Sequence, residues 1–544
     1  MSQRRRIPRL IGTLLLVAAA GVGCGEATAQ GRTEGGRAAA EPGVRPLGRI
    51  VPVPASVTPE GRPYVLSRTT RIGIDTRSAD AKALGGYLAG LLRPATGFPL
   101  PVVDERAAEG GILLRLRSGE TALGDEGYRL RSAPEGLTVT ARTPAGLFHG
   151  LQTVRQQLPA AVERDSVQPG PWKVAGGTVT DTPRFAYRGV MLDVARHFFT
   201  VDQVKRYIDQ AALYKVNTLH LHLTDDQGWR IAIDSWPRLT THGGSTQVGG
   251  GPGGFYTKDD YREIVRYAAS RHQEVIPEID LPGHTNAALS SYAQLNCDGV
   301  APPLYTGINV GFSTLCASKP VTYDFVDDVI REIAALTPGR YLHIGGDEAR
   351  ATSHADYKTM MDKVQPIVAK YGKKVVGWHQ LTGTTPADGA LVQYWGHDRT
   401  PAADKERVAE VARAGTGVIV SPADRSYIDM KYTKDYALGL SWAGYVEVQR
   451  SYDWDPATYL PGVPESAVRG VEAALWTETL STSAHLDEMA FPRLPGVAEL
   501  GWSPAAGHDW ESYKVRLAEQ APRFEALGIG WYRSPQVPWP GAGS

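Results

Sequence analysis

The chain has 544 residues, and its 58 Lys and Arg are balanced by 58 Asp and Glu, so the formal net charge is zero. This length is too great for one ordinary hydrophobic core and suits two domains, one of them large. The balanced charge argues against a protein that binds nucleic acid or anionic membranes through a basic surface, so neither partner is expected.

The first 30 residues are typical of an export signal peptide. Arginines at positions 4, 5, 6 and 9 precede an apolar stretch, residues 11–22, that is too short to span a bilayer. Val22-Gly23-Cys24 resembles the end of a bacterial lipoprotein signal, in which Cys24 would carry the lipid. Simple cleavage is the alternative, because Gly21 stands where such signals usually have a larger aliphatic residue. We expect a secreted protein or a cell-surface lipoprotein, held at the membrane only through Cys24.

Residues 31–46 are rich in Gly, Ala, Glu and Arg and are predicted to be a flexible linker. Residues 47–181 are predicted to form a small N-terminal α+β domain. Its expected elements are helices at 81–92 and 143–158, a strand at 112–116, and a hairpin of 128–130 with 137–141. No cluster of reactive residues is apparent in this part of the sequence.

From residue 182 to residue 535, strand patterns alternate with helical patterns. The eight expected strands are at 189–194, 218–223, 274–279, 341–344, 375–378, 391–395, 418–421 and 471–476. Eight such repeats predict an α/β fold of the (β/α)₈ TIM-barrel type rather than an open doubly wound sheet. No glycine-rich phosphate loop or dinucleotide fingerprint follows any of these strands, and no cofactor is expected.

Charged or aromatic residues follow every predicted strand. In chain order they include Arg196, Asp225, Asp280 with His284, Asp347 with Glu348, Trp378, Trp395, Tyr427 with Asp429, and Trp476 with Glu478. Active sites of barrel enzymes lie at the carboxyl ends of the strands. A pocket with aromatic walls, several carboxylates and one arginine suits a sugar, because rings stack on its apolar face and carboxylates bind its hydroxyls.

The most informative segment is Tyr341 to Glu348, an apolar strand that ends in Gly345-Gly346 and two adjacent carboxylates. Neighbouring like charges raise the pKa of at least one group, so one acid can donate a proton while the other stays anionic. The two glycines, which lack Cβ atoms, allow a close approach of backbone or ligand.

These strand-end segments, from about Arg188 to Trp502, resemble glycoside hydrolase family 20, and most of all its secreted actinobacterial members. The first domain also resembles the small N-terminal domain of that family. The resemblance implies an exo-acting β-N-acetylhexosaminidase that removes terminal GlcNAc, or also GalNAc, from chitooligosaccharides or glycans. It also implies a substrate-assisted, retaining mechanism, in which the acetamido oxygen of the sugar attacks the anomeric carbon and forms an oxazolinium.

The resemblance assigns a role to each site residue. Glu348 is the general acid and then the general base, Asp347 stabilises the charged acetamido group, and Tyr427 orients it. Asp280 and His284 form a pair that tunes Glu348, although His284 could instead be a structural histidine. The expected sugar ligands are Arg196, Asp225, Asp429 and Glu478 for the hydroxyls, Trp378, Trp395 and Trp476 for the walls, and Trp442 for the next subsite.

Two further expectations concern cysteine and metal. Cys297 and Cys316 form an even pair in an exported chain, which suggests a disulfide, with two buried free thiols as the alternative. His220 and His222 share one strand face near Asp225, but the pattern lacks a third clustered histidine, so no metal is expected. We expect a monomer.

Two other functions remain open. The same fold could serve a lacto-N-biosidase or a biofilm-polysaccharide hydrolase, although the pair of Arg196 and Asp429 favours a pocket for a single sugar. A noncatalytic sugar-binding lipoprotein is the alternative from another class. The combination of Asp347, Glu348 and Tyr427 argues against it, because binding alone does not require a proton donor.

Overall fold

The computed structural model describes residues 44–541. The predicted signal peptide, Cys24 and most of the predicted linker lie outside these described residues. Among the helices of the described part, none combines the length and the apolar character needed to cross a membrane.

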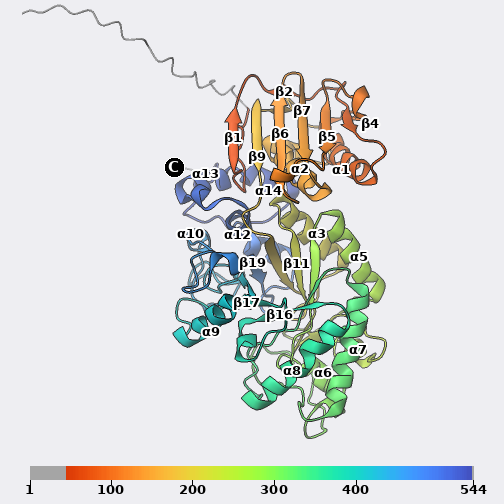
Figure 1. Cartoon of the computed structure of the whole chain (residues 1–544), viewed down its shortest axis with the longest axis vertical. Helices are drawn as coiled ribbons and strands as arrows, with labels where there is room; N and C mark the ends of the chain where they lie inside the picture. The colour runs from red at the N-terminus through yellow and green to blue at the C-terminus, as the bar shows by residue number, and fades with distance from the viewer. Residues whose placement is uncertain (1–43, 542–544) are drawn as a thin grey trace, which may run out of the picture. The chain divides into compact units, whose positions relative to one another are not determined.

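The first part of the described chain is a seven-stranded sheet with two helices, as the prediction of an α+β domain requires (Figure 1). The strand order is β1-β9-β6-β7-β5-β3-β4, which mixes parallel and antiparallel pairs. The strands are β1 (Ser56–Pro59), β3 (Ile72–Ile74), β4 (Val102–Asp104), β5 (Ile112–Leu116), β6 (Tyr128–Ala133), β7 (Gly136–Ala141) and β9 (Gly177–Asp181). A separate ladder joins β2 (Tyr64–Val65) to β8 (Lys173–Val174).

The two helices of this domain have clear boundaries. Helix α1 (Ala79–Thr96) begins after Ser78, whose side chain caps it, and ends at Gly97 with a left-handed φ of 64°. Helix α2 (Pro144–Gln157) begins after the capping residue Thr143. Both helices bury apolar residues in one core with the sheet. Helix α1 extends beyond the predicted range at both ends.

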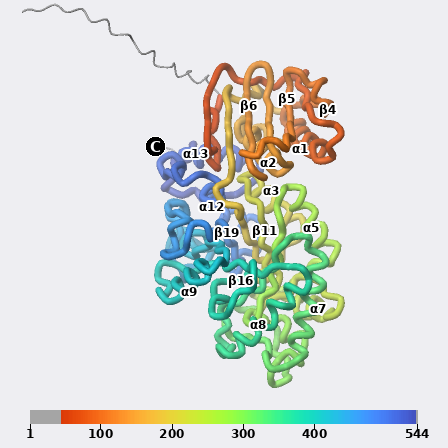
Figure 2. Tube along the Cα trace, viewed as in Figure 1, coloured from red at the N-terminus to blue at the C-terminus, as the bar shows by residue number. Residues whose placement is uncertain are grey.

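Eight parallel strands close into a barrel, which confirms the predicted fold class. They are β10 (Tyr187–Asp193), β11 (Thr218–His222), β14 (Glu274–Glu278), β15 (Tyr341–His343), β16 (Lys374–Trp378), β17 (Leu391–Tyr394), β18 (Gly417–Val420) and β19 (Val468–Leu475). The barrel closes because β10 pairs with both β11 and β19. Figure 2 shows the consequence, since the blue β19 lies close to the yellow-green β11.

From β10 onward, the described chain also contains twelve α-helices. The long ones are α3 (Val201–Leu213), α5 (Lys258–Ser270), α7 (Pro320–Leu336), α8 (His354–Lys370), α9 (Ala402–Arg413) and α12 (Arg493–Trp502). Shorter helices are α4 (Arg238–Thr241), α6 (Asn286–Ser291), α10 (Val448–Tyr452), α11 (Ser483–Ala490), α13 (Trp510–Ala518) and α14 (Ala521–Leu527). Thr200 and Thr257 start α3 and α5 with capping boxes.

The barrel departs from the predicted pattern in two places. Strand β16 is followed by a 3₁₀ turn, His379–Gly383, and not by an α-helix. Strand β18 ends at Val420, so Tyr427 and Asp429 lie in the segment beyond the strand and not at its end, as the sequence had suggested. Tyr427 is fixed there by a bridge to Ala474 of β19.

Candidate active site

A cavity of about 710 Å³ opens at the carboxyl ends of the barrel strands. Most of the predicted site residues line it. They are Arg196, His284, Asp347, Glu348, Trp395, Tyr427, Asp429, Trp442, Trp476 and Glu478. Residues that are as far apart in sequence as Arg196 and Glu478 meet here because the barrel brings the ends of all its strands to one face.

Asp225 is placed differently from the prediction that it binds sugar hydroxyls. Its carboxylate is buried, with 1% of the residue exposed, and its oxygens are occupied by protein groups. Oδ2 lies 2.8 Å from Arg196 Nη2 and 2.8 Å from His222 Nε2. Oδ1 lies 3.1 Å from His284 Nδ1. Asp225 therefore holds two residues of the cavity wall from behind.

Trp378 and Asp280 also lie behind the wall. Trp378 is fully buried, and its indole Nε1 donates to Glu278 Oε1 at 2.8 Å. It supports Trp476, whose ring centroid is 5.9 Å away, and does not line the cavity itself. Asp280, predicted to pair with His284, lies within 4.8 Å of it, and its charge contributes to raising the pKa of His284. The hydrogen bond of His284 Nδ1 goes to Asp225, however, and Asp280 accepts from the backbone N–H of Gly346.

The loop that carries the adjacent acids Asp347 and Glu348 has an unusual backbone. Gly345, Gly346 and Glu348 all have positive φ angles, of 65°, 100° and 43°. A Cβ on Gly345 would lie 1.7 Å from Asp280 Oδ1, so only glycine fits there. Strained φ values persist only where surrounding contacts hold them, and they are common at functional sites.

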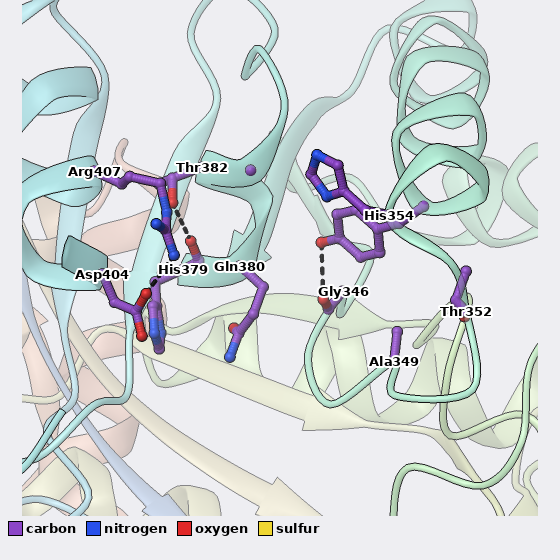
Figure 3. A pocket seen from close by; sticks show the side chains of 11 residues that line it. Gly346, Ala349, Thr352, His354, His379, Gln380, Thr382, Asp404 and Arg407 are labelled. Atoms are coloured by element: carbon purple, nitrogen blue, oxygen red, sulfur yellow. Dashed lines mark hydrogen bonds and ion pairs between the residues drawn. The ribbon is translucent and has the colours of Figure 1, made fainter. Parts of the chain in front are cut away.

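The contacts that hold this loop come from both sides. Gly346 donates its N–H to Asp280 at 3.2 Å and accepts a hydrogen bond from the Tyr357 hydroxyl at 2.8 Å. Figure 3 shows Gly346 with this bond at the edge of a second cavity, which has a volume of about 680 Å³. Gln380 also lines this second cavity and accepts from Trp395 Nε1 at 2.9 Å, so it positions a wall of the first one.

One histidine, His284, lies close to both adjacent acids of the site. His284 Nε2 lies 3.7 Å from Asp347 Oδ2 and 3.6 Å from Glu348 Oε2. Burial alone would lower the pKa of His284, but the charges of Asp225 and Asp347 outweigh it and raise that pKa well above the ordinary value. His284 is therefore a buried cation between Asp225 and the two adjacent acids.

The two adjacent acids respond in opposite ways. Burial and the charge of Glu348 raise the pKa of Asp347 to about 6, against the opposing effect of His284. Burial would also raise the pKa of Glu348, but His284 and Arg350 outweigh it, so that pKa lies below the ordinary value. Arg350 contacts Glu348 Oε1 at 2.7 Å. The expectation that one pKa is raised is met by Asp347.

Five buried polar atoms of the residues that line the cavity have no hydrogen-bond partner within the described part of the chain. They are Arg196 Nε, His284 Nε2, Asp347 Oδ1, Asp429 Oδ1 and Trp476 Nε1. Buried polar atoms in native proteins are nearly always paired, so such a group of orphans indicates a missing polar ligand. Carboxylate oxygens that accept, with nitrogens of Arg196 and Trp476 that donate, suit the hydroxyl and amide groups of a sugar on an aromatic wall.

A loop that sequence reasoning missed completes the cavity. Ile308, Asn309 and Val310 line it, and they lie in the segment closed by the Cys297–Cys316 disulfide. The predicted disulfide is confirmed. Arg350, His397 and Leu440 were missed as well. Of these three residues, only Arg350 could have been found from the sequence, because it stands two residues after Glu348.

The reasoning on metal binding was wrong in one respect. A third histidine, His343, does stack on His220, with ring centroids 4.6 Å apart. Both nitrogens of His220 lie 2.9 Å from a carboxylate, Nε2 from Glu278 and Nδ1 from Glu472. These groups pair with one another, so they form a network of buried ion pairs in place of open ligand positions.

The fold and the cavity together define a class. A closed (β/α)₈ barrel, with adjacent acids in an aromatic-walled pocket at its carboxyl end, is a barrel glycoside hydrolase.

Comparison with known proteins identifies the family. Residues 185–505 match the glycosyl hydrolase family 20 catalytic domain, and residues 48–182 match domain 2 of the same family. The chain belongs to glycosyl hydrolase family 20 and is therefore an enzyme that cleaves glycosidic bonds.

The chain is similar to several named hexosaminidases. A β-N-acetylhexosaminidase of Cellulomonas fimi is 44% identical, over 91% of this chain and 98% of its own length. The solved N-acetyl-β-hexosaminidase of Streptomyces plicatus, bound to Thio-NAglucal, is 71% identical with a TM-score of 0.90, over 92% of this chain and 99% of that one. The family 20 enzyme of Streptomyces coelicolor A3(2) is likewise 71% identical with a TM-score of 0.90, over 91% and 99% of the two chains.

Proposed function

We propose that the protein is an exo-acting, retaining β-N-acetylhexosaminidase that uses the acetamido group of its substrate as the nucleophile. The observation that carries this proposal is the unpaired, buried Asp347 Oδ1 beside Glu348 in a pocket that also contains Tyr427. Support comes from the similar Streptomyces plicatus enzyme, a variant of which has been solved with the product GlcNAc.

In the first step, the acetamido oxygen attacks the anomeric carbon while the glycosidic bond breaks. Glu348 gives its proton to the departing oxygen. Asp347 accepts a hydrogen bond from the acetamido N–H and balances the positive charge of the oxazolinium. Tyr427, which is buried between the rings of Trp442 and Trp476, donates its hydroxyl to the acetamido oxygen and aligns it for attack.

In the second step, Glu348 accepts a proton from water as that water attacks the anomeric carbon. The bond between this carbon and the acetamido oxygen breaks, and the acetamide is restored. Two inversions at the same carbon give net retention. No covalent bond to the enzyme forms, so no carboxylate needs to lie beneath the sugar as a nucleophile.

The exo character follows from the cavity wall. Arg196, Asp429 and Glu478 converge on one side of it and would bind the hydroxyls of the nonreducing sugar. Burial and the charge of Glu478 raise the pKa of Asp429 well above the ordinary value, so a protonated Asp429 can donate as well as accept. Trp442, 42% exposed, would stack on the next sugar at the open side.

The proposal also covers the cellular location and the oligomeric state of the enzyme. The arginine-led apolar N-terminus favours export, and the Cys297–Cys316 disulfide suits an oxidising compartment. Lipidation at Cys24 is the means of retention at the cell surface. A monomer is sufficient for activity in this proposal, because a single chain supplies every residue that lines the cavity described above.

The test is product analysis on a reduced chitotetraose, which is labelled at one end. Release of single GlcNAc units from the nonreducing end, one after another, supports the proposal. Release of disaccharides contradicts the single-sugar pocket. Full recovery of the intact tetrasaccharide would indicate a binding protein and refute the enzymatic function.

A further inference from the structure

Six buried charged residues form a continuous column through the interior of the barrel. In order of contact they are Glu472, His220, Glu278, His222, Asp225 and His284. Acidic and basic residues alternate along this column, and each of the six is 3% exposed or less. The column ends at the catalytic pair, because His284 faces Asp347 and Glu348.

The links of the column are short. Glu278 Oε2 lies 2.9 Å from His220 Nε2 and 2.5 Å from His222 Nδ1. His222 Nε2 lies 2.8 Å from Asp225 Oδ2. An imidazole with a carboxylate oxygen at each nitrogen can donate to both only as the imidazolium. His222 is therefore a cation between two anions.

Burying the charges of this column costs desolvation free energy. A well-packed apolar interior would often be as stable as buried ion pairs or more stable, so stability alone does not explain their presence. Glu278 and His222 do not line the substrate cavity. They do contact residues that support it, since Glu278 accepts from Trp378 and His222 holds Asp225.

We propose that Glu278 and His222 are positioning residues for catalysis, which hold Asp225 and His284 in place and set the electrostatic field at Asp347 and Glu348. This inference rests on the proposed function of the catalytic pair. Neither residue touches the substrate, so their effect reaches the reaction only through His284, Trp378 and the field that they create.

Other charged groups also face this pair. Asp193 at the end of β10 and Arg196 in the segment after it lie near His222, and Arg196 Nη1 is 3.4 Å from His222 Nε2. From β15, His343 lies 3.1 Å from Glu278 Oε1. Besides burial, the charge of Glu278 raises the pKa of Asp280, and the charge of His222 lowers it.

At a greater distance, the negative charge of Glu278 contributes, besides burial, to raising the pKa values of Tyr427 and Asp347. Glu472 is linked to Glu278 through His220, which contacts both carboxylates. All of these groups remain in both variants, but those that contact the replaced residue lose a charged partner, so each shift reports the substitution together with the response of its neighbours.

The two substitutions have opposite expected effects on the pH profile. The alkaline limb of kcat/KM reports the loss of the last proton from the Asp347–Glu348 pair. Glu278→Gln removes a negative charge, so the pair loses its proton more easily and the limb moves to lower pH. His222→Asn removes a positive charge, so the limb moves to higher pH. Each shift should be about half a unit to one unit for a charge at this depth.

The experiment measures kcat and KM against pH for an aryl β-GlcNAc in the wild type, Glu278→Gln and His222→Asn. We expect kcat to fall at least tenfold in both variants while KM stays within threefold. The matched control is Glu499→Gln, which removes a buried carboxylate of α12 that pairs with Arg516 of α13, away from the column. The control should leave the limb in place even if it loses stability.

Shifts of equal sign in both variants, or no shift in either, would overturn the inference and leave a purely structural role. A second measurement covers the case of poor folding. In ¹⁵N-histidine-labelled wild type, the His222 and His284 resonances should be those of imidazolium at pH 7. A neutral His222 there would also overturn the inference, whereas an inactive wild type would instead refute the proposed function.

Discussion

His284 lies with its Nδ1 3.1 Å from Asp225 and its Nε2 3.6 Å from Glu348, so one imidazole joins a buried anion to the catalytic acid. Its backbone φ of 56° is held in a region that few non-glycine residues adopt. The barrel thus fixes the cationic His284 next to Glu348 and sets the direction from which its imidazole faces the carboxylate. This arrangement makes Asp225 part of the catalytic support and removes it from the set of sugar ligands.

The pH profile follows from the two catalytic acids. They titrate as one pair, in which Asp347 has a pKa of about 6 and Glu348 a pKa below its ordinary value. These pKa directions favour a single proton on Asp347 in the free enzyme, whereas the mechanism requires that proton on Glu348 once the acetamido N–H binds Asp347. We expect a bell-shaped kcat/KM whose alkaline limb lies near pH 6. A profile that stays flat to pH 8 would contradict this description of the free enzyme.

Arg350→Gln should move that limb. Arg350 contacts Glu348 and lowers its pKa, so its removal lets Glu348 keep its proton to higher pH. We expect the alkaline limb to shift upward by a fraction of a unit, as measured with an aryl β-GlcNAc. A downward shift would show that Arg350 acts in another way, for example on the leaving group.

Glu348→Gln should separate substrates by leaving group. Proton donation contributes about 10²- to 10⁴-fold to rate, and only poor leaving groups need it for the first step. We expect a loss of that size in kcat/KM for GlcNAc disaccharides and a much smaller loss for a dinitrophenyl glycoside. Equal losses on both substrates would count against Glu348 as the acid.

Tyr357→Phe tests the support of the strained loop. It removes one hydroxyl, which donates to Gly346 and does not touch the substrate cavity. The Gly346 carbonyl next to Asp347 would lose its partner, so we expect kcat to fall about tenfold because small displacements of catalytic groups are costly. The KM of the aryl substrate should change little. Unchanged kcat would show that Asp280 and the backbone hold the loop without Tyr357.

Replacing Cys297 and Cys316 together by serine should loosen the loop that carries Ile308, Asn309 and Val310. The disulfide closes a segment with a sequence separation of 19, so its loss should lower the free energy of unfolding by about 3 kcal/mol. We expect KM to rise for oligosaccharides and to change little for small aryl glycosides. Chemical denaturation and steady-state kinetics on both substrates provide the comparison.

Much of the architecture could be predicted because each barrel strand is a short apolar run followed by a charged or aromatic residue. The strand ends then placed Asp347, Glu348, Trp395, Trp476 and Glu478 correctly at the cavity. The side chain of Asp225 could not be placed in this way. The chain turns into the β12–β13 hairpin (Thr224–Asp225 with Gly228–Trp229) directly after β11, and this hairpin packs Asp225 against His222.

Other parts of the site leave little trace in the sequence. His343 lies within an apolar strand, where a single histidine gives no sign of its stacking partner on β11. Tyr357 lies on the amphipathic helix α8, where an aromatic residue is usually core. The segment with Ile308 has no periodicity, so its position over the cavity follows only from the disulfide and from tertiary contacts such as Gln227 to Gly307.

The central claim is that the acetamide of the substrate is the nucleophile, and the most direct measurement compares two substrates. One aryl leaving group is released from a β-GlcNAc and from a β-glucoside, which differ only at C2. Fast release from the first and essentially none from the second is the predicted result. Comparable rates on both would mean that an enzyme carboxylate attacks the sugar, and the roles of Asp347 and Tyr427 would then be wrong.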